Sequence, residues 1–310
     1  MTVLFTHPAC LDHDTGPGHP ERPDRLRAVL RALEAEEFQY LERAEAPLAE
    51  ESQLLLAHTV RHVDGVRQHV PEQGLAALDG DTILSPGSWE AARRAAGAVI
   101  AAIDLVMAGR TSNAFCAVRP PGHHAERDRA MGFCLFNNIA IGALHARQVH
   151  QVQRIAVVDF DVHHGNGTQD VFENDPDLFF ASTHQNGIYP GTGMAAEHGI
   201  DGNILNVPLP SGTGSQPWRA AMTDKVLPAL KSFSPDLILI SAGFDAHEDD
   251  PLAGMRLTAE DFGWGTEEIC KIAADICAGR IVSTLEGGYD LDALAASTAS
   301  HVRALMAVSS

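Results

Sequence analysis

Three residues that could bind a metal ion follow an apolar run in the middle of the sequence. Asp159, Asp161 and His163 occupy alternate positions of DFDVHHGNGT (159–168), directly after Ile155–Val158. If the chain stays extended here, their side chains point to one face. Two carboxylates beside an imidazole are costly to bury unless a cation compensates them, and the segment contains no Lys or Arg. The spacing therefore predicts a metal site rather than a solvated loop or an ion-pair network.

A carboxylate from a distant part of the chain could complete this site. Asp245 lies in SAGFDAHEDDPLAG (241–254), which follows the separate apolar run Leu237–Ile240. Two carboxylates and one imidazole, with a position left for water, are typical of catalytic zinc, although these ligand types also admit Fe(II), Mn and Co. Two aspartates cancel the charge of Zn²⁺, so water bound there is less acidic than at a site with three histidines. Such a centre therefore needs a separate base for the water and a separate electrophile for the carbonyl.

Other polar residues could meet that need. The pair His123–His124 in RPPGHHAE (119–126) could transfer protons. Tyr289, beside two glycines in EGGYD (286–290), could donate a hydrogen bond to a developing oxyanion. Taken alone, the histidines could form an exposed loop pair, and Tyr289 could be an ordinary packing residue. Their occurrence beside the predicted metal site favours the catalytic interpretation.

Each of these segments follows a predicted strand, and helical patterns separate the strands. Apolar runs typical of strands buried on both faces occupy Val3–Thr6, Ala114–Val118, Ile155–Asp159, Leu178–Ser182, Ile204–Val207, Leu237–Ser241 and Ile281–Leu285. Helices are predicted at Glu21–Glu37, Ser88–Ala108, Asn137–Gln148, Gln216–Ser232, Thr258–Ala278 and Leu291–Val308. The alternation predicts one α/β domain over residues 1–310 with a mostly parallel sheet, whose ligands bind beyond the carboxyl ends of the strands.

Composition restricts the class of protein further. The 310 residues are 45% hydrophobic and 20% charged, which is typical of a globular chain. The net charge of −19 argues against general nucleic-acid binding; it suits a cationic substrate but also simple solubility. Five cysteines without a CxxC pair indicate buried thiols in a reducing compartment. With no signal peptide and no membrane-spanning stretch, we expect a cytoplasmic protein without membrane contacts. The sequence is compatible with a homo-oligomer.

The order of the motifs resembles that of a known enzyme family. The sequence contains, in order, RPPGHHA, GFC (132–134), D-x-DVHHGNGT, YPGTG (189–193), SAGFDA and LEGGY. This arrangement is similar to that of bacterial, class II-like members of the zinc-dependent histone deacetylases, within the arginase/deacetylase superfamily. The resemblance extends from HPERPDRL (19–26) to the final helix. It implies a single three-layer α/β/α domain around an eight-stranded sheet, and a hydrolase that removes acyl groups from amines.

The resemblance also implies roles for individual residues. The zinc ligands would be Asp161, His163 and Asp245. The tandem histidines His123 and His124 would activate water and protonate the leaving amine, with Asp159 supporting His123 and Asn166 supporting His124. Class II enzymes have Asn at that last position and class I enzymes have Asp. Tyr289 would polarise the acyl carbonyl.

The remaining implied residues form the substrate tunnel and an ion site. Phe133 and Tyr189 would wall a narrow tunnel for an acyl-lysine side chain, Gly132 would accept the substrate amide N–H through its carbonyl, and Asp81 would hold the substrate backbone at the rim. The family also carries a structural K⁺ ion. The residues that match its site are Asp159, Asp161, His163 and Ser182.

The substrate is the least determined part of the resemblance. The class II polyamine deacetylase carries Glu where this chain has Leu252, and bacterial polyamine deacetylases have a long insertion where Leu11–His19 is short. These differences favour acyl-lysine in proteins or peptides. Deacetylation of an acetylpolyamine or another small N-acyl amine is the main alternative, and a non-catalytic acyl-lysine binder is a minor one. A second metal site at His58 and His62, spaced i, i+4, is not favoured, because the family has a scaffold histidine at His58.

Overall fold

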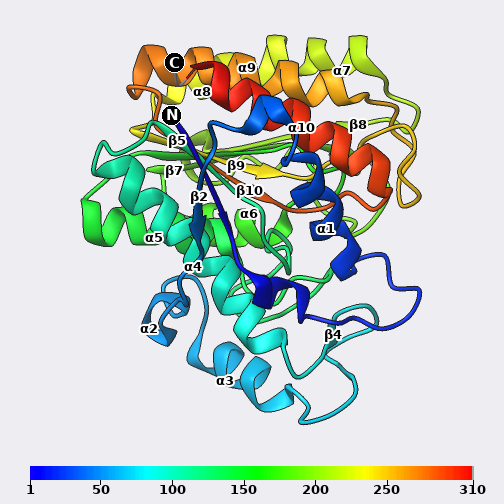
Figure 1. Ribbon diagram of the computed structural model, residues 1–310. Helices are drawn as coiled ribbons and strands as arrows, with labels where there is room; N and C mark the ends of the chain where they lie inside the picture. The colour runs from blue at the N-terminus through cyan, green and yellow to red at the C-terminus, as the bar shows by residue number, and fades with distance from the viewer. Residues whose placement is uncertain (309–310) are drawn as a thin grey trace.

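An eight-stranded sheet forms the centre of the computed structural model, which describes residues 1–308 (Figure 1). Its strand order is β2-β1-β5-β10-β9-β6-β7-β8, and all neighbouring strands are parallel. The strands are β1 (Thr2–Thr6), β2 (Glu42–Glu45), β5 (Asn113–Cys116), β6 (Ile155–Asp159), β7 (Leu178–Gln185), β8 (Ile204–Leu209), β9 (Leu237–Ala242) and β10 (Ile281–Leu285). A small antiparallel pair, β3 (Ala76–Ala77) with β4 (Ile83–Leu84), lies apart from this sheet.

Helices cover both faces of the sheet and give the predicted three layers. In Figure 1, α7 to α10 lie on one side of the sheet, and α4, α5 and α6 lie on the other. The first layer is α1 (Pro23–Ala32), α7 (Ser215–Ala221), α8 (Leu227–Phe233), α9 (Ala259–Ile276) and α10 (Leu291–Val308); the second is α4 (Ser88–Met107), α5 (Asn138–His150) and α6 (Asn166–Phe172). The short helices α2 (Glu51–Leu54) and α3 (Val60–His69) extend the second layer.

The apolar runs of the sequence form the central strands because both of their faces are covered. All residues of β5, β6, β9 and β10 are buried. These four strands are neighbours in the sheet, so the segments that follow them meet at one edge. The predicted three-layer fold with a parallel sheet is confirmed.

Some predicted elements differ in extent. The helix predicted at Glu21–Glu37 is α1, which ends at Ala32, and a separate 3₁₀ turn follows at Glu36–Phe38. The helix predicted at Gln216–Ser232 is divided by a π-helical turn, Met222–Val226. Pro228 follows this turn, and a proline lacks the N–H that a regular helix requires.

No helix within residues 1–308 is long and apolar enough to cross a lipid bilayer.

Candidate metal centre and catalytic site

The polar segments predicted from the sequence converge beyond the carboxyl ends of β5, β10, β9 and β6. The strand β6 ends at Asp159, so Asp161 and His163 stand in a bend and not, as predicted, on an extended strand. The bend nevertheless brings both side chains to Asp245, which follows β9. The three residues come together through the order of the strands, not through alternation along one strand.

Asp161, His163 and Asp245 form a buried set of possible metal ligands. Nδ1 of His163 lies 3.2 Å from Oδ1 of Asp161 and 3.1 Å from Oδ2 of Asp245. The donor atoms of all three lie within 4.8 Å of one another. The backbone N–H groups of Val162 and Gly287 donate hydrogen bonds to Asp245 and Asp161 respectively, and these bonds orient the carboxylates.

The surroundings of this set fit a divalent cation. Burial raises the pKa of Asp245, because a charged carboxylate is costly away from water. Burial lowers the pKa of His163, but hydrogen bonds to Asp161 and Asp245 outweigh it and raise that pKa to about 10. The pair of carboxylates therefore attracts positive charge strongly at this point. A Cβ atom added at Gly287 would lie 2.2 Å from Asp245 Oδ2 and 2.6 Å from Asp161 Oδ2, so only glycine fits beside these two carboxylates.

The two adjacent histidines differ in their partners. Nδ1 of His123 lies 2.9 Å from Oδ2 of Asp159, and Nδ1 of His124 lies 2.8 Å from Oδ1 of Asn166. The two rings are 4.0 Å apart between centroids. Since an Asn oxygen can only accept, Nδ1 of His124 carries the hydrogen, and Nε2 is the nitrogen left for proton exchange.

The different partners separate the charge states of the pair. Burial lowers the pKa of His123, but the carboxylates of Asp161 and Asp159 outweigh it and raise that pKa well above its ordinary value. Burial and the neighbouring imidazoles lower the pKa of His124 well below its ordinary value. Burial also raises the pKa of Asp159 to about 6. The pKa values of the two histidines are therefore shifted in opposite directions, as suits a proton donor beside a proton acceptor.

A cavity of about 210 Å³ opens above this centre. The tunnel and rim residues implied by the resemblance line it together with two histidines and Tyr289. The lining residues are Asp81, His124, Gly132, Phe133, His163, Tyr189, Leu252 and Tyr289. The structure therefore brings to one cavity residues that lie more than 200 positions apart in the sequence.

The wall residues are held in set positions. Phe133 has a φ of 68°, in the left-handed region that a bulky residue rarely adopts, and its backbone N–H donates to Oγ1 of Thr82 at 3.2 Å. The ring of Tyr189 stands edge-on to His124, with centroids 5.1 Å apart. The carbonyl of Gly132 accepts a hydrogen bond from Sγ of Cys134 at 3.3 Å. Leu252 is 38% exposed and stands at the mouth of the cavity.

Tyr289 is fixed from three directions. Its backbone N–H donates to Oδ2 of Asp250 at 2.7 Å, its ring meets Phe133 edge-on at 5.8 Å, and the Arg25 guanidinium lies 4.9 Å from its ring centroid. Burial raises the pKa of its hydroxyl well above the ordinary value. The hydroxyl therefore stays protonated and can donate a hydrogen bond into the cavity.

Two of the residues matched to the K⁺ site lie on neighbouring strands. Asp159 and Ser182 are paired across β6 and β7, and Oγ of Ser182 lies 2.9 Å from Nδ1 of His184.

His58 and His62 do not converge on a metal position. Nε2 of His58 accepts from the backbone N–H of Asn137 at 2.8 Å, and Nε2 of His62 donates to the carbonyl of Leu135 at 2.8 Å.

Two buried carboxylates near the centre were not predicted from the sequence. Oε2 of Glu286 accepts from the backbone N–H groups of Gly122 and His123, at 2.7 and 3.2 Å, and thus fixes the turn before the histidine pair. Burial raises the pKa of Glu286 to about 7. Its place at the start of the EGGYD segment, directly after β10, was the only sequence signal.

Glu21 is the other unpredicted carboxylate, and it is buried between two arginines. Its oxygens accept from Nη2 of Arg119 at 2.7 Å and from Nη1 of Arg25 at 3.0 Å. Arg25 also donates to the carbonyls of Gly288 and Glu286, so the network supports the segment that carries Tyr289. Arg22, the neighbour of Glu21 in the sequence, pairs with Asp24 at the surface.

We expect Glu21→Gln to lower the free energy of unfolding by about 3–5 kcal/mol, because it leaves two buried guanidinium groups without their charge partner. Burial would raise the pKa of Glu21, but Arg119 and His13 hold it well below its usual 4.5. The stabilisation is therefore complete above pH 4.5 and declines as the pH falls towards the lower folded-state pKa.

Urea denaturation of the wild type and the variant across this acidic range measures both effects. The control is Glu37→Gln, which breaks an exposed pair with Arg303 and should cost less than about 1 kcal/mol. Equal costs for the two substitutions would contradict a structural role for the buried network.

Known proteins resemble this chain over nearly its whole length. A family model described as Histone deacetylase domain matches residues 19–305. Histone deacetylase 14, chloroplastic, of Arabidopsis thaliana is 39% identical over 98% of this chain and 76% of its own length. The histone deacetylase-like amidohydrolase of Pseudomonas aeruginosa is 39% identical over 93% of this chain and 81% of its own.

A solved structure shows the same agreement in three dimensions. The crystal structure of the HDA15 HD domain superposes with a TM-score of 0.92 at 36% identity, covering 99% of this chain and 88% of that one. The converging histidines and carboxylates, the family match and the shared architecture lead to one conclusion: this chain belongs to the histone deacetylase family of deacetylating hydrolases.

Proposed function

We propose that this protein is a zinc-dependent hydrolase that removes acetyl or other short acyl groups from lysine side chains of proteins or peptides. The observation that carries the proposal is the buried set Asp161, His163 and Asp245 beside a cavity of about 210 Å³. When bound there, Zn²⁺ supplies Lewis acidity that makes water more acidic and polarises a carbonyl. The remaining functions fall to the side chains around it.

The residues around the centre have distinct tasks in this proposal. His124 lines the cavity and takes the proton of the attacking water at Nε2, since Asn166 holds its Nδ1. His123, supported by Asp159, donates a proton towards the leaving amine. Tyr289 donates a hydrogen bond from its hydroxyl to the oxyanion that develops from the acyl carbonyl. The carbonyl of Gly132 accepts the amide N–H of the substrate.

The cavity favours a long, unbranched amine substrate presented by a larger molecule. Phe133 and Tyr189 offer apolar walls to the lysine methylenes, and Asp81 offers a carboxylate at the mouth for the substrate backbone. Leu252 carries no charge that could bind a second ammonium group, which supports acyl-lysine over acetylpolyamines. A K⁺ ion at Asp159, Asp161, His163 and Ser182, held in part by main-chain oxygens, belongs to the same proposal.

Metal removal tests the zinc dependence. A chelator should abolish acetate release from an acetyl-lysine peptide. Added Zn²⁺ should restore this activity once one equivalent is bound by Asp161, His163 and Asp245. Full turnover by the metal-depleted protein would contradict the proposal.

We expect Leu252→Glu to shift the preference towards acetylated polyamines. A carboxylate at the partly solvated mouth attracts a distal ammonium by about 1–2 kcal/mol, or about tenfold in relative kcat/KM. Competition between N-acetylputrescine and an acetyl-lysine peptide measures the shift. The control is Leu48→Glu, at a similarly exposed leucine that does not line the cavity. An unchanged ratio in Leu252→Glu would show that this residue does not face the substrate.

A further inference from the structure

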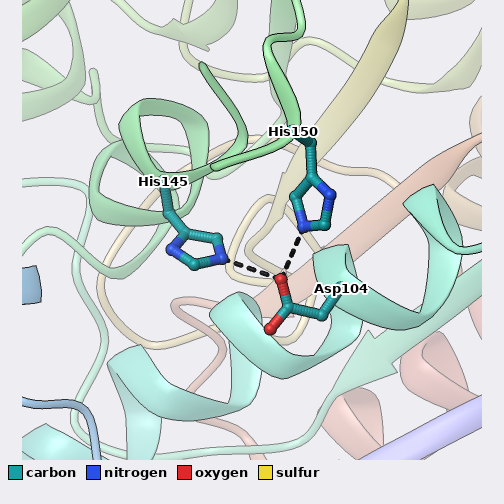
Figure 2. Close-up of side chains that lie close together, drawn as sticks. All are labelled: Asp104, His145 and His150. Atoms are coloured by element: carbon teal, nitrogen blue, oxygen red, sulfur yellow. Dashed lines mark hydrogen bonds and ion pairs between the residues drawn. The ribbon is translucent and has the colours of Figure 1, made fainter. Parts of the chain in front are cut away.

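A second group of possible metal ligands lies between helices α4 and α5, and none of its members lines the catalytic cavity. Figure 2 shows the imidazoles of His145 and His150 pointing at one carboxylate oxygen of Asp104. Nε2 of His145 lies 2.8 Å from Oδ1 of Asp104, and Nε2 of His150 lies 2.6 Å from the same atom. The three donor atoms lie within 4.8 Å of one another.

The packing of the two helices holds these residues in place. At Gly142, one turn before His145, the helices approach so closely that an added Cβ atom would lie 2.5 Å from Val99 Cγ1 and 2.9 Å from Ile103 Cδ1. This close approach sets Asp104, the next residue of α4, opposite His145. The site is therefore built on two rigid elements and not on mobile loops.

The local charge favours a cation at this point. Both ion pairs of Asp104 are with the two imidazoles, and no Lys or Arg pairs with it among residues 1–308. Asp104 stands in the last turn of α4, and His150 is the last residue of α5. The negative ends of both helix dipoles thus lie beside the group.

We propose that Asp104, His145 and His150 form a second metal site, which binds Zn²⁺ or a similar divalent transition metal. Two imidazoles and one carboxylate are ligands that such ions prefer. The side chain of His145 is 7% exposed, and those of His150 and Asp104 are 23% and 48% exposed, so solvent can supply the remaining ligand. On metal binding each Nε2 would lose its hydrogen and bind the ion, and each neutral imidazole would then carry its hydrogen on Nδ1 instead.

Such a metal would clamp α4 to α5 and would not take part in deacetylation. Zn²⁺ titration of metal-depleted protein, followed by metal analysis after desalting, measures the number of sites. We expect two zinc ions per wild-type chain and one in both His150→Gln and Asp104→Asn. The kcat/KM of the zinc-loaded variants should equal that of the wild type. Excess Zn²⁺ should raise the melting temperature of the wild type more than that of either variant.

Matched variants separate this inference from the catalytic proposal. His69→Gln changes an exposed histidine on α3 and should retain two zinc ions. Asp245→Ala should lose the catalytic ion but keep the one between α4 and α5. If the wild type and His150→Gln bind equal amounts of zinc, the group is a hydrogen-bonded helix contact and the inference is wrong. That result would leave the catalytic centre unaffected.

Discussion

Asp245→Ala should remove the catalytic zinc ion and turnover together. Asp245 contributes one of the two carboxylates of the centre, and its removal leaves only Asp161 and His163 to hold the ion. Loss of an outer partner of a metal ligand already costs about 10–100-fold in affinity, so loss of the ligand itself should cost at least ~100-fold. We expect acetate release from an acetyl-lysine peptide to fall by the same factor or more at limiting zinc.

The control for this substitution is Asp249→Ala. Asp249 is four residues away, and its side chain is 71% exposed, so its loss changes the local charge without touching the centre. Zinc content is best measured in a His150→Gln background, in which the site between α4 and α5 is disabled. Full zinc occupancy of Asp245→Ala in that background would contradict the ligand assignment.

Tyr289→Phe should lower kcat by roughly 10²–10³, the range for losing one oxyanion donor. The hydroxyl acts mainly in the transition state, while Phe133, Tyr189 and the metal ligands bind the substrate, so KM should change little. The ring contacts with Phe133 and Arg25 do not involve the hydroxyl and remain in the variant. The variant should still bind zinc and hydroxamate inhibitors.

Tyr189→Phe is the matched control, because it removes a hydroxyl from the same cavity but retains a wall. Its kcat should stay within about threefold of the wild type, since no oxyanion donor is lost. A near-normal kcat in Tyr289→Phe would make Tyr289 a packing residue and leave the metal as the only electrophile.

Much of the candidate site could be predicted because its residues follow strands that are continuous in apolarity. Such strands are buried neighbours in a parallel sheet, so Asp161, His163 and Asp245 had to meet at one edge. The alternation argument for Asp159–His163 placed Asp161 and His163 together by a partly wrong route, since the strand ends at Asp159.

Other features could not be predicted because they lack a local pattern. The edge strand β2, with the sequence ERAE, is largely exposed and has a neighbour on one side only, so it shows no apolar run. The pairing of Glu21 with Arg119 joins residues 98 positions apart. His145 and His150 are five residues apart, a spacing that does not place two side chains on one helix face, and they converge only because Asp104 lies between them.

The choice between a protein and a small-molecule substrate is tested most directly by one kinetic comparison. On the zinc-loaded protein, kcat/KM for an acetyl-lysine peptide should exceed that for N-acetylputrescine. Only the peptide has a backbone for Asp81, and the neutral Leu252 gives the distal ammonium of the polyamine no partner. We expect a ratio of at least ~10, equivalent to about 1.4 kcal/mol of transition-state binding. A higher kcat/KM for N-acetylputrescine would contradict the assignment as an acyl-lysine deacetylase.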